Sequence, residues 1–179
     1  MTEWTPVEIQ ALCSPLTNLT HLKLTFTLKS QKSFVEHVLL NLATQLVSLE
    51  IVTYPSNLKP DGSIENYFSL HFPMLETLRT LVFDEQVPAC MDFLRRNTTL
   101  RHLTLTVQEG PPREWDFSAM QLESLTLPIQ KEHFTHLWLP STLRSFVIPS
   151  LSDFASYFDN KVNFESLLAL EVFNQEELP

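Results

Sequence analysis

Histidines and cysteines are the residues best suited to catalysis or metal binding in this chain, and their spacing assembles neither kind of site. His133 and His136 lie three residues apart beside Glu132, a spacing that would begin a metal site on a helix, but no third ligand is near in the sequence. Cys13 and Cys90 form no Cys-x-x-Cys motif and have no base positioned by the sequence. We therefore expect no catalytic residue, metal or cofactor, and two buried cysteines. An enzyme with a site around the two histidines stays as an alternative.

The composition narrows the class of protein further. Only two of the 179 residues are glycine, Gly62 and Gly110, and neither has the neighbours of a phosphate-binding loop. Twelve Lys and Arg residues against 21 Asp and Glu residues give a formal net charge of −9, which disfavours nucleic acid as a partner. The sequence has no apolar run of about 18 residues and no secretory signal. We expect an intracellular protein, cytoplasmic or nuclear, without membrane association.

A short leucine pattern must supply the framework, because 31 of the residues are leucine. The pattern apolar-x-x-apolar-x-apolar occurs seven times, at 19–24, 46–51, 78–83, 100–105, 122–127, 143–148 and 167–172. The last positions of successive copies are 27, 32, 22, 22, 21 and 24 residues apart. Each copy ends in an alternating segment, such as residues 104–107, that is typical of a short strand.

Helical or irregular segments are expected between these strands. Residues 31–45 carry apolar side chains at helical spacing, and residues 89–96 predict a shorter helix, as do residues 152–158. The segments near Phe68 and Phe117 have no clear pattern. Residues 6–16 predict an N-terminal cap with Val7, Ile9 and Leu12 turned inward. Such units bury their apolar faces by stacking, so the strands should pair in parallel and in sequence order.

The stretch from Phe93 to Leu105, FLRRNTTLRHLTL, resembles a helix end that leads directly into a leucine-rich repeat. The chain is similar to that superfamily, in the irregular form found in F-box-associated and ribonuclease-inhibitor-like proteins. Where the family often has asparagine or cysteine, three residues after each core, this chain has Thr27, Tyr54, Gln86, Gln108, Gln130, Leu151 and Gln175, and it contains no F-box segment. The resemblance implies an α/β fold, a curved solenoid with about seven short parallel strands in sequential order on its concave face and helical or irregular returns on its convex face. Residues 1–179 would form a single array, with residues 1–18 as the cap.

The resemblance also implies a non-catalytic protein-interaction module that binds a protein or peptide on the concave face, as the substrate-recognition part of an F-box-type assembly does. The positions between the core residues then give the candidate partner-binding residues: His21, Lys23, Arg79, Arg101, His102, Glu123 and Arg144. Arginine suits an acidic peptide, because its planar guanidinium binds a carboxylate through two hydrogen bonds. The favoured alternative is a solvated ion-pair ladder in which Arg101 and Arg144 flank Glu123 on adjacent strands.

The C-terminus carries a further expectation. Pro179 follows Val172 by only seven residues, which is too short for another return helix. We expect the edge of the last strand to be covered by further chain or by a partner. The first alternative for the whole chain is a structural segment of a larger repeat protein, without a dedicated ligand, and the enzyme is the second.

Overall fold

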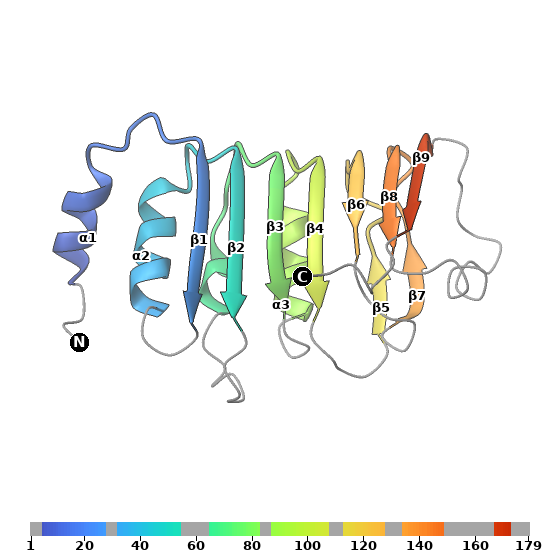
Figure 1. Ribbon diagram of the computed structural model, residues 1–179, viewed down its shortest axis with the longest axis horizontal. Helices are drawn as coiled ribbons and strands as arrows, with labels where there is room; N and C mark the ends of the chain where they lie inside the picture. Colours follow the sequence, from blue (N-terminus) through green and yellow to red (C-terminus); the bar gives the residue numbers. More distant parts are fainter. Residues whose placement is uncertain are drawn as a thin grey trace.

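The computed structural model describes residues 5–27, 32–54, 65–82, 87–107, 113–127, 134–148 and 167–172. It shows a mixed α/β fold built on a seven-stranded sheet, in which every neighbouring pair of strands is parallel (Figure 1). The strands follow one another in sequence order, as predicted. They are β1 (His21–Thr27), β2 (Ser48–Tyr54), β3 (Thr77–Val82), β4 (His102–Val107), β6 (Ser124–Thr126), β8 (Ser145–Ile148) and β9 (Ala169–Val172).

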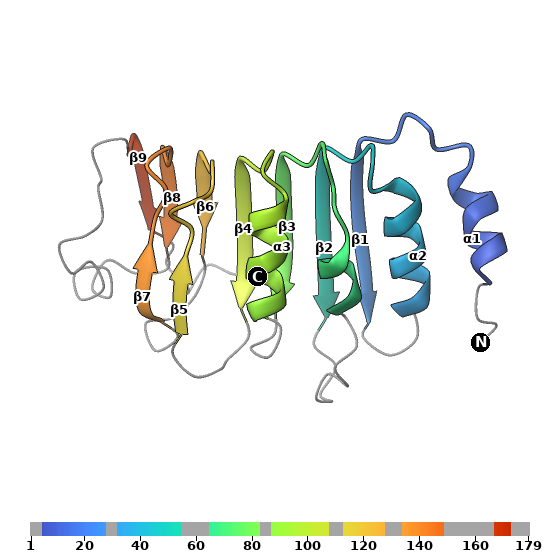
Figure 2. The same cartoon turned by 180° about the vertical axis from the view of Figure 1, so that it is seen from behind.

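One side of this sheet is covered by the segments that connect its strands. In Figure 2, the short 3-10 helix η1 (Glu65–Ser69) and helix α3 (Val87–Arg96) lie in front of the sheet, and α2 (Lys32–Leu42) lies beside β1. Strands β5 (Arg113–Asp116) and β7 (Phe134–Trp138) take the place of helices at the C-terminal end, where they form a separate two-stranded parallel sheet. The two predicted helices at 31–45 and 89–96 are confirmed, whereas strands at β5 and β7 were not anticipated.

The core lies between the sheet and this cover. Alternation along β4 is typical: Leu103 and Leu105 are buried, while His102 and Thr106 point to the other side and are exposed. On α3, Cys90, Phe93 and Leu94 are buried against the sheet, as their helical spacing predicts. Alternate residues of each strand therefore point to a second face, which carries most of the polar side chains of the strands together with a few apolar ones, among them the buried Val147.

Strand pairing corrects the third copy of the leucine pattern. Leu78, and not Leu81, pairs with Leu49 on one side and with Leu103 on the other. The third core is therefore Leu75, Leu78 and Thr80, three residues earlier than the predicted 78–83, and Leu81 lies on the opposite face. Successive third positions then become 27, 29, 25, 22, 21 and 24 residues apart, which removes the largest irregularity.

The prediction failed there because a polar residue occupies a core position. Thr80 is only 2% exposed, at a position where the other strands have leucine, isoleucine or valine. Its hydroxyl lies 2.8 Å from the hydroxyl of Tyr67 in η1, which satisfies both buried groups. A search for apolar residues alone therefore passes over the true core and stops at the next leucine.

Helix α1 (Pro6–Cys13) stands at the N-terminal end of the array, beside α2 (Figure 1). Thr5 and Glu8 form a reciprocal capping box at its start. Ile9 and Cys13 are buried, but Val7 and Leu12 are exposed, so the prediction that all three apolar residues turn inward is wrong for these two. One face of α1 suffices for its contact with α2. The predicted helix at 152–158 falls outside the described residues.

Candidate functional site

The face of the large sheet that points away from the helices is the first candidate site. None of the described helices covers it, and neither does the sheet of β5 and β7 (Figures 1 and 2). Its side chains form rows that cross the strands. We define the central row as Lys23, Glu50, Arg79, Thr104, Thr126, Val147 and Glu171, which are aligned by strand pairing. We define the edge row as the residues just before each strand: Thr20, Val47, Glu76, Arg101, Glu123, Arg144 and Leu168.

The edge row is set by one backbone arrangement that recurs at all six strand junctions. Each edge-row carbonyl accepts two amides of the next strand, from its edge-row residue and from the residue that follows. Thr20 O, for example, accepts from Val47 N and Ser48 N at 2.8 and 3.0 Å. The other five junctions repeat this geometry, with all twelve distances between 2.7 and 3.0 Å. The edge-row side chains therefore stand about 4.8 Å apart per strand step.

In the central row, two cations share one carboxylate. Glu50 Oε1 lies 3.0 Å from Lys23 Nζ and 3.5 Å from a guanidinium nitrogen of Arg79. Both cationic side chains stay more than 60% exposed, whereas that of Glu50 is 24% exposed. Such exposed pairs add little stability because water competes for both ions. Two cations and one carboxylate nonetheless give this cluster one excess positive charge. The ion pairs with Glu50 restrain the side chains of Lys23 and Arg79.

Charges alternate along the edge row over Glu76, Arg101, Glu123 and Arg144. The expected ladder of ion pairs does not form there: among the side chains that the structure describes, the ion pairs on this face all involve Glu50. Arg101 instead donates to the backbone carbonyl of Gln121 at 2.9 Å. The side chain of Arg144 is exposed. Neither arginine therefore forms an ion pair with Glu123 in the described part of the chain.

The seven predicted site residues all lie on or beside this face, but in three rows: the central row, the edge row and the first residues of the strands. Arg79 belongs with Lys23 in the central row, and not with Arg101 and Arg144 as its predicted core position required. His21 and His102 start β1 and β4; both are exposed, and His21 Nδ1 lies 2.8 Å from the hydroxyl of Thr20.

Sequence reasoning missed two acidic members of the face. Glu50 was not singled out because its role depends on pairing between strands that are distant in sequence. Glu76 was hidden by the error in the third core, and a core starting at Leu75 would have placed it directly in the edge row.

The uncovered face differs in charge from the rest of the chain. It carries four of the chain's 12 Lys and Arg residues and four of its 21 Asp and Glu residues. The four cations are Lys23, Arg79, Arg101 and Arg144, and the four anions are Glu50, Glu76, Glu123 and Glu171, the last placed in the central row by strand pairing. A face without net charge on a chain of net charge −9 repels an acidic ligand less than the rest of the molecule does.

The residues considered for catalysis or metal binding form no cluster within the part of the chain that the structure describes. His133 lies outside the described residues, and His136 is on strand β7, where it pairs with Glu114 at 3.5 Å. Within the described ranges, no three His, Cys, Asp or Glu side chains gather to hold a metal ion. Cys13 and Cys90 are buried, as predicted, and burial raises the pKa of both thiols, which disfavours the reactive thiolate.

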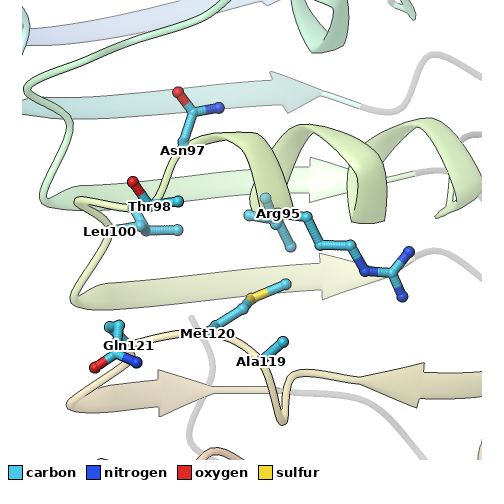
Figure 3. A pocket seen from close by; sticks show the side chains of 8 residues that line it. Arg95, Asn97, Thr98, Leu100, Ala119, Met120 and Gln121 are labelled. Atoms are coloured by element: carbon cyan, nitrogen blue, oxygen red, sulfur yellow. The ribbon is translucent and has the colours of Figure 1, made fainter.

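The second candidate site is a hollow on the covered side of the large sheet, along α3. Figure 3 shows its smaller part, of about 90 Å³, where Asn97, Thr98 and Leu100 after the helix face Ala119, Met120 and Gln121 after β5. Arg95 extends away from them into a larger part, of about 420 Å³, lined also by Met91, Glu114, Asp116, Ser118 and Trp138. We call the two parts together the α3 groove.

The described helices include none that is long and apolar enough to cross a membrane. Comparisons of the chain with protein-family models, with curated proteins and with solved structures each found no match. The geometry of the sheet face and of the α3 groove is therefore the basis for assigning a function.

Proposed function

We propose that this chain is a non-catalytic protein-interaction module of the leucine-rich-repeat type, which binds an acidic peptide segment on the uncovered face of its large sheet. Sequential parallel pairing, the leucine positions in register and the recurring double acceptor at each strand junction support the repeat assignment. The curved solenoid shape belongs to this proposal as well.

The observation that carries the ligand assignment is the cluster of Lys23, Glu50 and Arg79. Two exposed cations around one carboxylate retain charge for a second carboxylate from a ligand. Arg101 and Arg144 add two further cations in the edge row, where they alternate with Glu76 and Glu123. A rigid sheet keeps these groups in position before the ligand arrives, which lowers the entropic cost of binding.

Fluorescence anisotropy with a labelled decapeptide of alternating glutamate and serine tests the proposal. The double variant Lys23→Gln/Arg79→Gln should bind this peptide roughly tenfold more weakly, because two cations that would meet its carboxylates are removed. The variant Glu50→Gln should bind it more tightly, since both cations are released from their internal partner. General loss of structure would weaken peptide binding in both variants. It therefore does not explain weaker binding by Lys23→Gln/Arg79→Gln together with tighter binding by Glu50→Gln.

The double variant Lys32→Gln/Arg95→Gln is the matched control, because it removes the same charge from helices α2 and α3, which do not cover this face. Equal weakening by this control, or unchanged binding by the Lys23→Gln/Arg79→Gln variant, would contradict the proposal.

A further inference from the structure

The cover of the large sheet changes from helices to strands between α3 and β5, and the α3 groove lies at this junction. A helix and a strand present their side chains with different periods, so the side chains do not interlock at the junction as those of two helices would. The larger part of the groove, about 420 Å³, falls within the range of small-ligand sites. Its walls come from α3 on one side and from the outer face of β5 and β7 on the other.

The outer face of these two strands combines carboxylates with aromatic rings. Pairing sets Glu114 opposite His136 and Asp116 opposite Trp138. The ring of His136 stacks on the indole of Trp138, with centroids 5.4 Å apart and planes at 16°, which restrains the indole. An indole beside carboxylates is a suitable surface for a cation, because the ring face and the anions both attract positive charge.

Asp116 is held ready as an anion. Its Oδ1 accepts hydrogen bonds from the hydroxyl of Ser118 at 2.6 Å and from the backbone amide of Ser118 at 3.0 Å. These bonds from Ser118, the hydroxyl foremost, with a smaller contribution from the charge of Arg95, keep the pKa of Asp116 below its ordinary value. The carboxylate therefore has a fixed orientation and keeps its charge at neutral pH.

Arg95, the cation already in the groove, does not neutralise its carboxylates. Arg95 is engaged by Asp92 one turn earlier on α3, at 3.6 Å. Among the residues that line the larger part of the groove, Glu114 and Asp116 outnumber Arg95 by one negative charge, and the side chain of Glu114 is 65% exposed. This charge is opposite in sign to that of the cluster of Lys23, Glu50 and Arg79 on the sheet face.

We propose that the α3 groove binds an arginine or lysine side chain of a partner protein, seated between the carboxylates of Glu114 and Asp116 and against the indole of Trp138. This second ligand surface is independent of the acidic-peptide site on the other side of the sheet. The module would then contact two oppositely charged segments at once, one on each side.

The probe is a labelled decapeptide of alternating arginine and serine, compared with the same peptide carrying citrulline, a neutral residue of nearly the same shape as arginine. We expect measurable anisotropy with the arginine peptide and at least tenfold weaker binding of the citrulline peptide. The variant Glu114→Gln/Asp116→Asn should weaken binding of the arginine peptide at least tenfold, and Trp138→Leu should weaken it severalfold. Equal binding of the two peptides, or no binding of the arginine peptide at millimolar protein, would overturn the proposal.

Two controls separate specific binding from attraction to an acidic chain. The variant Glu76→Gln/Glu123→Gln removes the same charge from the sheet face and should leave binding of the arginine peptide within twofold of the parent; an equal loss would count against the groove. Because Asp116→Asn also alters the turn at Ser118, Glu114→Gln alone is measured as well, and no weakening by this exposed single variant would also overturn the proposal. The sheet-face variant Lys23→Gln/Arg79→Gln should not weaken binding of the arginine peptide. The groove proposal and the acidic-peptide proposal can therefore fail independently.

Discussion

The N-terminal and C-terminal halves of the sheet use the same leucine positions but are covered differently. Strands β1 to β4 have six or seven residues and lie under α2, η1 and α3, whereas β6, β8 and β9 have three or four and are accompanied by β5 and β7. The inward leucines remain in register throughout. The comparison shows that the leucine positions set the register of the strands, while the connecting segments set how much is packed on top of them.

The packing of the two covers differs in kind. Under the helices, Phe93 lies within 5.6–6.2 Å, centroid to centroid, of the rings of Tyr67, Phe68 and Phe72. At the C-terminal end, Phe117 stacks on Trp115 at 6.0 Å. Both phenylalanines are fully buried. We expect the helical half to tolerate change less well.

The largest effect is expected from Phe93→Ala. Removal of a buried phenylalanine ring costs about 3–5 kcal/mol of unfolding free energy, and Phe93 should lie at the upper end because its ring packs among three other aromatic rings. Phe117→Ala is the matched variant and should cost roughly 1–2 kcal/mol less, because the ring of Phe117 stacks on one indole, that of Trp115. Urea unfolding followed by circular dichroism measures both, and equal losses of stability would remove the proposed difference between the halves.

Asn97→Ala should come next. The buried Asn97 side chain accepts from Phe72 N and donates to Phe93 O, both at 2.7 Å, and so ties the end of α3 to the segment before β3. Its removal leaves a buried amide and a buried carbonyl without these partners, at a cost of about 2–3 kcal/mol. Asn18→Ala, at an exposed asparagine, should cost under about 0.5 kcal/mol. Similar unfolding midpoints for the two variants would show that Asn97 does not anchor the helical cover.

A double-mutant cycle on Tyr67 and Thr80 sharpens the account of the polar core position. Thr80→Val alone should destabilise by about 1–2 kcal/mol, because the buried Tyr67 hydroxyl loses its partner, whereas Tyr67→Phe should cost less, because the Thr80 hydroxyl still donates to the carbonyl of Leu81. The double variant should lose less than the sum of the two, since the unmatched Tyr67 hydroxyl is removed as well. Strict additivity in the measured unfolding free energies would mean that the hydroxyl contact does not couple η1 to β3.

The smallest effect is expected at α1, outside both halves. The amide and hydroxyl of Thr5 both donate to Glu8 and hold the pKa of this carboxyl below its ordinary value of 4.5. A lowered folded-state pKa means that the stabilisation is present above pH 4.5 and is lost as the pH falls through the folded-state value. Amide exchange in α1 should therefore accelerate below about pH 4 relative to α3. Glu8→Gln should remove this extra pH dependence, and its persistence would exclude the capping box as the cause.

The strand order, two of the three helices and the burial of the cysteines could be predicted from sequence, because apolar spacing reports directly which side chains face a core. The third core could not, since Thr80 is buried through a hydroxyl partner in a segment that has no periodic pattern. Strands β5 and β7 were also missed. Their alternation of buried and exposed residues is short. The buried side chain of β5 is Trp115, which sequence alone did not place in the core. The α3 groove was out of reach for the same reason, because it exists only where two unlike covers meet.

The sequence predicted which residues lie on the candidate sheet face, but not which of their charged side chains form ion pairs. Residues on alternate positions of a strand share a face by geometry alone, which placed Lys23 and Arg101 there from sequence. Which cation meets which carboxylate depends on register between strands, and one misplaced core moved Arg79 into the wrong row. The central cluster around Glu50 therefore emerged only from the strand pairing.

The recurring double acceptor at the strand junctions has a consequence for how such a chain can change in length. Each strand joins its predecessor through the same double acceptor at the junction and through parallel pairing along its length, so its placement requires only its immediate neighbours. Insertion or loss of one strand together with its connecting segment would leave the remaining junctions intact. Gene segments that encode such a unit can therefore be duplicated or deleted in evolution without redesign of the rest of the molecule.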